Sequence, residues 1–348
     1  MAGERPAEIV IVSLGSTEGL RRADEELAGS LTRAGARAVV ASAAAPREVR
    51  TLMLTDLAWA RRARAAAAAA LERHAGSAPP AAIYSSTTAA LLWPRPGAVR
   101  FDATAAANRP GRHGLWQRPL ERRRLRGAGL LLPWSEGALR EAPSLASLSR
   151  SALVLPVPVE PSGPAAAEGD RDITAITYAA NPRKKGLDAV LAAWRQVRRE
   201  HPSEAHGELL VAGADAGEIS AAGIELESHE GVRLLGRLPA PEYRALLRRC
   251  RVFVCAPRRE DYGIAQLEAL ADGCRLVSTP SPGPYAALPI ARTLDARLIG
   301  DDLAAALGCA LADPAAGYRE RALQALQPYS RAAIDRLVAE RLLPRLLA

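Results

Sequence analysis

The sequence alternates short apolar runs with longer segments in which apolar residues recur at helical spacing. Runs of four to seven apolar residues are typical of buried strands, and the segments between them are typical of amphipathic helices. Alternation of this kind folds into parallel sheets with helices on both faces. The sequence therefore predicts an α/β fold with doubly wound parallel sheets. The expected strands are 8–14, 38–41, 82–85, 98–101, 128–132, 152–155, 173–178, 208–212, 232–235, 251–256 and 275–278.

One segment rich in proline and glycine interrupts this alternation. Four prolines and one glycine lie between Pro156 and Pro164, and the charged residues 168–172 follow. Such a composition is typical of a linker. With 348 residues, the chain is long enough for two hydrophobic cores. We expect four regions, namely an N-terminal domain over 1–157, a linker over 158–171, a C-terminal domain over 172–328 and a final helix over 329–348.

Residues 251–273 are the part of the second domain that says most about function. The pattern predicts a buried strand, then a charged loop, then a helix that begins after Gly263. A helix start presents unpaired N–H groups, and glycine has no Cβ, so a phosphate can approach the backbone there. Glu260 precedes the helix, whereas Glu268 lies more than a turn inside it, where a carboxylate can accept hydrogen bonds from a ribose diol. Solvated helix charges are the alternative interpretation.

A basic loop follows the first strand of the second domain. It contains Arg183, Lys184 and Lys185, and it ends at Gly186. We expect this loop at the same edge of the sheet as Glu260, because the carboxyl ends of parallel strands meet at one edge. Three cations there can neutralise a diphosphate and stabilise it as a leaving group. A solvated basic turn is the alternative.

The first domain offers fewer candidates. Gly15 lies in a turn between the first strand and the first helix, where it suits either a phosphate or a tight connection. Asp102 follows the fourth strand, where it can orient an acceptor hydroxyl, take its proton, or cap the next turn. His113, in an arginine-rich loop, is a weaker candidate for the same role.

The order of elements over residues 173–314, together with the two glutamates, resembles a known family. Glu260 and Glu268, with seven residues between them, are similar to the glutamate pair of retaining nucleotide-sugar glycosyltransferases with the GT-B fold, particularly glycosyltransferase family 4. The resemblance implies two Rossmann-like domains that face a cleft. The first domain would hold the acceptor and the second the nucleotide sugar, and the final helix would pack back on the first domain.

The resemblance also implies roles for single residues. The backbone at Gly263 and Ile264 would hold the donor diphosphate, Glu268 would bind the ribose, and Glu260 would contact the donor sugar. Lys185 matches the phosphate-binding lysine of the family. Arg237 lies in a loop that resembles the one in contact with the nucleotide base.

Two departures from the family pattern affect this transfer of roles. The family has Gly-Arg upstream of the lysine, but here Ala179, Ala180 and Asn181 occupy that region. Either Arg183 or Lys184 substitutes for the missing arginine, or one fewer cation holds the diphosphate. The Gly-Phe-Gly that usually follows the first glutamate is replaced by residues 261–263, Asp-Tyr-Gly.

The function implied is that of a hexosyltransferase-like enzyme. It would move a sugar from a UDP- or GDP-sugar to an acceptor hydroxyl with retention at the anomeric carbon, and it would need neither a bound cofactor nor a metal. Lys185, Glu260 and Asp102 are the catalytic candidates. Two other interpretations stay open. One is another reaction of the same fold, such as epimerisation or phosphorolysis. The other is a non-catalytic nucleotide- or anion-binding partner protein.

The net charge of +8 is concentrated in the first domain. Between Arg100 and Arg126 there are eight arginines and two acidic residues, so this segment carries +6. The stretch Arg109–Arg126 suits an anionic or lipid-linked acceptor, a peripheral contact with an acidic membrane, nucleic acid, or a solvated helix face. We favour the acceptor or membrane role, and nucleic acid least, because no nucleic-acid motif accompanies the cluster.

The sequence also indicates where the protein works. No apolar run approaches the length that spans a bilayer, and the N-terminus does not resemble a signal peptide. The four cysteines show no metal-binding spacing and fit reduced thiols. We expect a cytoplasmic protein, with the inner membrane face as a further peripheral location.

Overall fold

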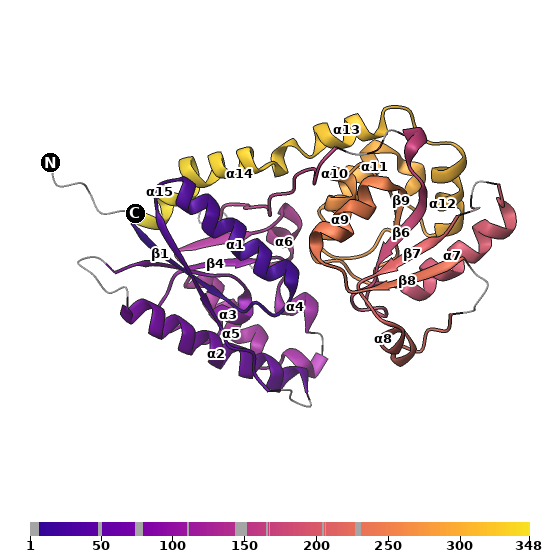
Figure 1. The fold of residues 1–348 in the computed structure, drawn as a ribbon. Coiled ribbons are helices and arrows are strands. Elements are labelled where there is room, and N and C mark those ends of the chain that lie inside the picture. Colours follow the sequence, from indigo (N-terminus) through magenta and orange to yellow (C-terminus); the bar gives the residue numbers. More distant parts are fainter. Residues whose placement is uncertain are drawn as a thin grey trace. The chain divides into compact units, whose positions relative to one another are not determined.

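The computed structural model of the chain describes residues 7–47, 51–73, 79–109, 111–142, 152–164, 166, 168–203, 205, 207–226 and 231–348. The chain divides into two compact units (Figure 1). Unit 1 comprises Met1–Pro158 and Tyr329–Ala348, and unit 2 comprises Val159–Pro328.

Unit 1 is built on a five-stranded parallel sheet. Its strand order is β2-β1-β3-β4-β5. From β1 the chain first adds β2 on one side and then adds β3, β4 and β5 on the other, so the order reverses between β1 and β3. The bounds of the strands are β1 Glu8–Ser13, β2 Arg37–Ser42, β3 Ala81–Tyr84, β4 Ala98–Phe101 and β5 Leu130–Pro133.

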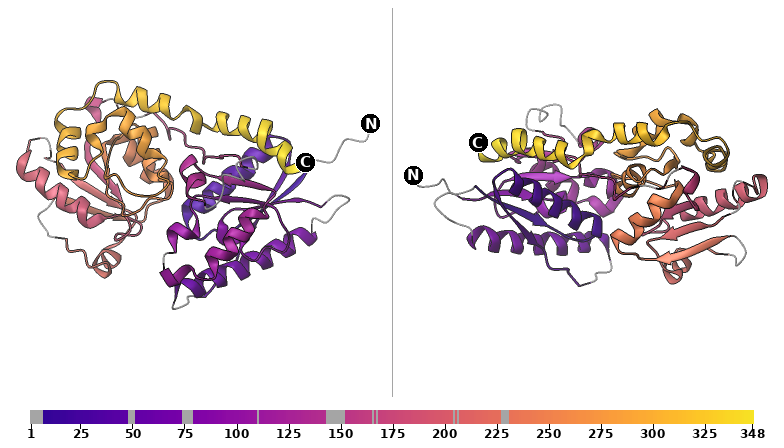
Figure 2. Two further views of the ribbon diagram at one scale, coloured as in Figure 1. Left: turned by 180° about the vertical axis from the view of Figure 1, so that it is seen from behind. Right: turned by 45° about the horizontal axis from the view of Figure 1, so that its top comes forward.

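Helices cover both faces of this sheet, with α1 and α2 on opposite sides (Figures 1 and 2). Small residues of α2, among them Ala63, Ala67 and Ala70, let this helix lie close to one face. Leu27 and Leu31 of α1 pack on the other face. The bounds are α1 Glu18–Arg33, α2 Leu52–Arg73, α3 Thr87–Ala90, α4 Ala105–Asn108, the 3₁₀ helix η1 Gly111–Gly114, α5 Gln117–Arg126 and α6 Glu136–Glu141.

The end of the chain returns to unit 1 as a nearly continuous helix. Ile334, Val338 and Leu342, spaced four residues apart, are buried in the same core cluster as Leu27 and Leu31. Arg33 and Asp335 form an ion pair with an N–O distance of 2.6 Å beside this contact. The elements are α14 Arg331–Leu337, the π-helical turn η7 Val338–Leu342 and α15 Leu343–Leu347.

The expected strand over 152–155 is not a strand in the structure. The N–H groups of Leu153 and Leu155 donate to the carbonyls of Leu131 and Pro133 at 2.9 and 2.8 Å, yet only one bridge, Leu131 with Ala152, is formed. The reason is that Pro133 has no N–H to donate in return, so the ladder cannot continue. The segment lies along β5 as an irregular edge.

Unit 2 is a second five-stranded parallel sheet, with strand order β10-β9-β6-β7-β8. The strands are β6 Ile173–Tyr178, β7 Leu209–Ala212, β8 Val232–Gly236, β9 Cys250–Cys255 and β10 Arg275–Ser278. The helices are η4 Glu168–Asp170, α7 Leu187–Glu200, α8 Ala216–Ala221, α9 Ala240–Arg249, α10 Ile264–Ala271, α11 Ala287–Leu294, η5 Ala296–Leu298, α12 Leu303–Ala312 and α13 Tyr318–Ala325, and η6 Gln327–Tyr329 spans the boundary between the units. The prediction of doubly wound parallel sheets is confirmed.

Candidate functional site

The strand order of unit 2 places its candidate site between β6 and β9. The chain builds β6, β7 and β8 in one direction and then crosses to β9 and β10 on the other side. In open α/β sheets, ligands bind beyond the carboxyl ends of the strands at such a switch point. The loops after β6 and β9 meet there, and they are the two loops that the sequence singled out.

Backbone contacts fix these two loops against each other. The N–H of Arg258 donates to the carbonyl of Lys184 at 2.9 Å. Gly186 has φ +63°, and a Cβ at this position would lie 1.9 Å from the carbonyl oxygen of Ala256. No side chain fits there without a shift of the backbone, so glycine is required for α7 to begin this close to the end of β9.

The charged side chains of the two loops form ion pairs. The Lys185 Nζ lies 2.6 Å from Oε2 of Glu260, and the Gln266 side-chain amide donates to the same oxygen at 2.9 Å. Glu260 is 5 % exposed, so this pair is largely withdrawn from water. The structure thus brings together two residues predicted separately, and it adds Gln266, which the sequence analysis did not identify.

A second set of charges lies beside the first. Lys184 pairs with Asp261 at 2.9 Å, and Arg259 donates to the other Asp261 oxygen at 2.9 Å. Burial raises the pKa of Asp261, but the charges and hydrogen bonds of Lys184 and Arg259 outweigh burial and lower it below its usual value. This carboxylate therefore stays ionised at neutral pH.

Helix α10 begins beside these charges. Its N-cap is Gly263, with φ +88°, and no side chain caps the first N–H groups. A Cβ at Gly263 would lie 2.9 Å from the ring of Tyr285, so the glycine is also required for packing. The loop after β10 supports the site from below, since the N–H of Glu260 donates to the Pro282 carbonyl at 3.0 Å. Glu260, Gly263 and Ile264 therefore share one short stretch at the start of the helix.

Glu268 occupies the second turn of α10, where it is buried. Arg244 of α9 donates to it at 3.2 Å and also pairs with Asp272 at 2.5 Å. Burial alone would lower the pKa of Arg244, but the hydrogen bond of Asp272 and the charge of Glu268 raise it. Asp272 also accepts from the N–H and hydroxyl of Ser162. Neither Arg244 nor Asp272 was predicted as a site residue from the sequence.

Two further candidates lie at the rim of the same edge. The Arg183 side chain is exposed, and its carbonyl accepts from Nε of Arg258 at 3.1 Å. Arg237, directly after β8, is exposed and pairs with Glu218 of α8 at 2.5 Å. The start of α8 is fixed by a capping box between Glu218 and Asp215, so the position of Arg237 is tied to that helix end.

The candidates of unit 1 lie after β1 and β4. Gly15 has φ +58°, and its carbonyl accepts from Arg21 at 2.9 Å. Asp102 accepts from the N–H of Ala103 at 2.9 Å and is half-buried, and the helix that follows has Thr104 as its N-cap. His113 lies exposed in η1. Within the described residues, no hydrogen bond joins His113 to Asp102.

A buried charge pair in unit 1 was not expected. Arg100 lies 3.3 Å from Asp24 of α1, and both side chains are 1 % exposed. The Arg100 guanidinium also stacks on Trp134 at 4.7 Å. Burial raises the pKa of Asp24 despite the opposing charge of Arg100. Arg100 was counted in the charge of the basic segment 100–126, but its side chain lies in the interior of unit 1.

The other arginines of the basic segment divide into two groups. Arg109 pairs with the buried Asp56 at 2.7 Å, and Arg124 stacks on Trp93 at 5.1 Å. Arg118 donates to the carbonyl of Gly111 at 2.7 Å. The exposed members are Arg112, Arg122, Arg123 and Arg126. Glu121 is buried, and both of its carboxylate oxygens accept from the N–H of Ala105.

The part of the chain that the structure describes offers neither a metal site nor a membrane span. Among those residues, no cluster of three or more histidine, cysteine, aspartate or glutamate side chains could ligate a metal ion. None of the helices there is both long and apolar enough to cross a bilayer.

Known structures share this two-unit architecture over nearly the whole chain. The Anabaena protein Alr3699/HepE, solved with UDP and glucose, has a TM-score of 0.68 at 13 % identity, covering 97 % of this chain and 100 % of its own. An E. coli structure described as trehalose-6-phosphate bound with UDP-2-fluoro glucose has a TM-score of 0.69 at 13 % identity, covering 98 % and 99 %. A UDP-forming α,α-trehalose-phosphate synthase from Burkholderia xenovorans, solved with glucose-6-phosphate, has a TM-score of 0.64 at 13 % identity, covering 99 % and 100 %.

At these identities the likeness establishes the fold, which is GT-B, as the sequence predicted. Residues 171–313 match the family of glycosyl transferases group 1. The matched range contains β6 to β10 and both loops of the candidate site. The resemblance predicted over residues 173–314 is confirmed by this match. No curated protein matches the sequence.

Proposed function

We propose that the chain transfers a sugar, with retention, from a nucleoside diphosphate donor to an acceptor hydroxyl. One observation carries this proposal. Lys185 and Glu260 are in contact at the switch point of unit 2, directly beside the uncapped start of α10. A cation next to free helix N–H groups suits a diphosphate, and a carboxylate next to that cation suits the hydroxyls of the attached sugar.

In the proposed arrangement each group has one task. The N–H groups at Gly263 and Ile264 hold the diphosphate, and Lys185 shares its charge between Glu260 and a phosphate oxygen. Glu260 accepts hydrogen bonds from the donor sugar, while Glu268 accepts them from the ribose. Arg183 and Lys184 add positive charge at the entrance, where the exposed Arg183 is available to replace the arginine that is missing from the family pattern.

The chemistry then needs no nucleophile from the protein. As the bond from the anomeric carbon to the diphosphate breaks, negative charge develops on the leaving oxygen, and Lys185 and the helix start stabilise it. The acceptor hydroxyl attacks from the same face, and its proton passes to a departing phosphate oxygen. Retention follows because attack and departure use one face of the sugar.

We infer a uridine nucleotide as the donor, with a guanosine nucleotide as the alternative. Two proteins of the same fold were solved with UDP or a UDP-sugar analogue. Arg237, at the end of β8, would lie beside the base.

The acceptor is proposed to bind unit 1. Gly15 and Asp102 follow β1 and β4 at the carboxyl edge of its sheet, which is where such sheets bind ligands. The four exposed arginines of residues 112–126 favour an anionic acceptor, which includes a phosphorylated sugar or a lipid-linked one at the inner membrane face.

The test is donor cleavage by the purified full chain. A panel of UDP- and GDP-sugars is incubated with the protein, and release of the nucleoside diphosphate is measured for the wild type, Lys185→Met and Glu268→Ala. Loss of a leaving-group cation in a water-poor site is expected to lower the rate by about 100-fold or more. Glu225→Ala, which removes an exposed carboxylate of the same unit, serves as the control.

The outcomes separate the remaining interpretations. Hydrolysis of one donor that is lost in both variants and kept in the control supports the proposal. Thermal stabilisation by UDP or GDP without cleavage of any donor would indicate the non-catalytic binding protein instead. If no nucleotide shifts the melting temperature, the donor site assigned to these loops is wrong.

A further inference from the structure

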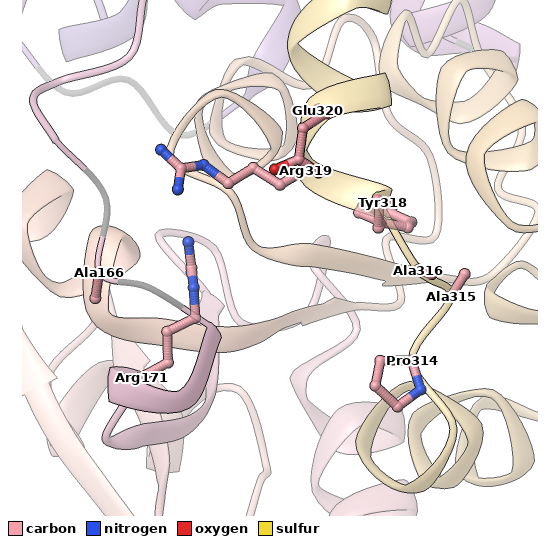
Figure 3. A pocket seen from close by; sticks show the side chains of 9 residues that line it. Ala166, Arg171, Pro314, Ala315, Ala316, Tyr318, Arg319 and Glu320 are labelled. Atoms are coloured by element: carbon pink, nitrogen blue, oxygen red, sulfur yellow. The ribbon is translucent and has the colours of Figure 1, made fainter.

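Unit 2 contains a pocket that the proposed reaction does not use. Its volume is about 470 Å³, and it is lined by Arg171, Arg319 and Glu320 together with Ala166, Tyr318 and the short segment 314–317 (Figure 3). All of these residues belong to unit 2, so the pocket is formed within one compact unit.

The pocket lies at the opposite edge of the sheet from the candidate donor site. Arg171 donates to the carbonyl of Cys250, the first residue of β9. It also donates, at 3.1 Å, to the carbonyl of Asp272, which follows α10. The hydroxyl of Tyr318 accepts from the N–H of Leu276 near the start of β10 at 3.2 Å. The amino ends of the strands therefore support the pocket, whereas Lys185 and Glu260 lie beyond the carboxyl ends.

Positive charge dominates the lining. Figure 3 shows the guanidinium groups of Arg171 and Arg319 pointing toward each other from opposite walls. Among the described residues, the Arg319 side chain has neither a hydrogen bond nor an ion pair, and Arg171 is bonded to carbonyls alone. Glu320 is the only acidic residue of the lining, and it is exposed. Two like charges that face each other without a carboxylate between them favour an anion in that position.

The start of α13 adds donors of the same polarity. Gly317 is its N-cap, with φ +63°, and no side chain caps the helix. The first N–H groups of a helix are unpaired within the helix and carry the positive end of its dipole. Arg171 still has donors beyond those bonded to the two carbonyls, since a guanidinium has five.

The size and the remaining lining indicate what kind of anion fits. A volume of about 470 Å³ is within the range of small-molecule sites and exceeds what an inorganic ion needs. Pro314, Ala315 and Ala316 give one wall an apolar surface. Guanidinium groups match the oxygens of a phosphate in pairs.

We propose that this pocket binds a small organic phosphate monoester. The phosphate lies between Arg171 and Arg319, and the organic part contacts the wall formed by residues 314–316. The site is separate from the donor site and is independent of the proposed transfer reaction.

The experiment is calorimetric titration of the full chain with inorganic phosphate and with glycerol phosphate at low ionic strength. Saturable binding is expected, with the ester binding more tightly than the inorganic ion. Arg319→Gln is expected to weaken binding on the order of tenfold, since one charge-assisted hydrogen bond is lost. Glu320→Gln is expected to tighten it, because the one acidic group of the lining is removed.

Two further variants locate the bound phosphate. Arg292→Gln removes an exposed arginine of α11 that does not line the pocket, and it should leave the affinity unchanged. Lys185→Met should also leave the affinity unchanged, because Lys185 lies at the other edge of the sheet. The proposal is overturned if no saturable binding occurs at millimolar phosphate, if Arg319→Gln binds as the wild type does, or if Lys185→Met abolishes binding. Equal affinity for both anions would overturn the assignment to an ester.

Discussion

Gly186 determines, at the scale of a single residue, how closely the two loops of the candidate site approach. We predict that Gly186→Ala lowers the free energy of unfolding by about 3 kcal/mol or more, because the added Cβ would lie 1.9 Å from a backbone oxygen and the backbone must shift. Denaturant or thermal unfolding of the full chain measures this loss.

A second glycine of the same unit provides a matched control. Gly236 has φ +65°, nearly the φ of Gly186, but nothing lies within 4 Å of its added Cβ. Gly236→Ala should therefore cost only the left-handed backbone strain, about 1 to 2 kcal/mol. Equal losses for the two variants would show that the close approach of Gly186 to Ala256 contributes nothing.

Asp261 gives the site a predictable dependence on pH. Its pKa in the folded protein is lowered by Lys184 and Arg259, so its contribution to stability is complete above the unfolded pKa of about 3.9. That contribution is lost as the pH falls through the lower, folded pKa. We predict that the difference in melting temperature between the wild type and Lys184→Met is constant from pH 5 to 7 and shrinks below about pH 4. A difference that grows on acidification would contradict this assignment.

Helix α10 links the candidate site to the core of unit 2 at the scale of one element. Its first turn lies beside Glu260, and Asp272 at its C-cap is fully buried and bonded to Arg244 and Ser162. Asp272→Asn removes the shorter of two ion pairs of the buried Arg244 and leaves its pair with Glu268 at 3.2 Å. We predict a loss of about 3 kcal/mol in the free energy of unfolding, measured by denaturant titration.

An exposed ion pair is the control for that prediction. Asp172 and Arg249 lie on the surface of the same unit, with both side chains more than half exposed. Asp172→Asn should cost less than about 1 kcal/mol, because water screens the charges. If the two substitutions lower the free energy of unfolding by the same amount, the charge of Asp272 does not stabilise the end of α10.

Local pattern explains which parts of these elements the sequence could predict. The strand, the charged loop and the helix over 251–273 follow from spacing and from Gly263, all within one short stretch, and β9 and α10 appear as expected. The Lys185 loop could be placed at the same edge because parallel strands share one direction. The contact between Lys185 and Glu260 follows from that placement, although its distance does not.

Partners that are distant in sequence could not be predicted from pattern alone. Arg244 lies on α9 and Asp272 caps the end of α10, and only the strand order of the finished sheet brings these helices together. The burial of Arg100 could not be predicted for the same reason, since its buried partner Asp24 is 76 residues away. The single bridge at residue 152 shows the opposite case, because one proline in β5 overrides a pattern that is typical of a strand.

At the scale of the whole molecule, each of the two sheets has its own core, but the core of unit 1 is made from both ends of the chain. The chain enters unit 2 after Pro158 and returns to unit 1 at Tyr329. The final helix therefore completes the core of unit 1, whose other elements come from the N-terminal part of the chain. Val338 is fully buried in that core, in the same cluster as Ile9, Ile11 and Leu31.

Val338→Asp tests this division of the molecule. A carboxylate buried without a partner should cost about 4 kcal/mol or more, which raises the opening of unit 1 roughly a thousandfold. Hydrogen exchange measured by mass spectrometry should become faster in β1 and α1, while β6 and β9 stay protected because their core lies in unit 2. Ala339→Asp places the same charge on the adjacent, exposed residue and should leave both units protected. Equal loss of protection in β9 and β1 with Val338→Asp would mean that the two units unfold as one. Faster exchange with Ala339→Asp would mean that the added charge itself, and not its burial, disturbs the helix.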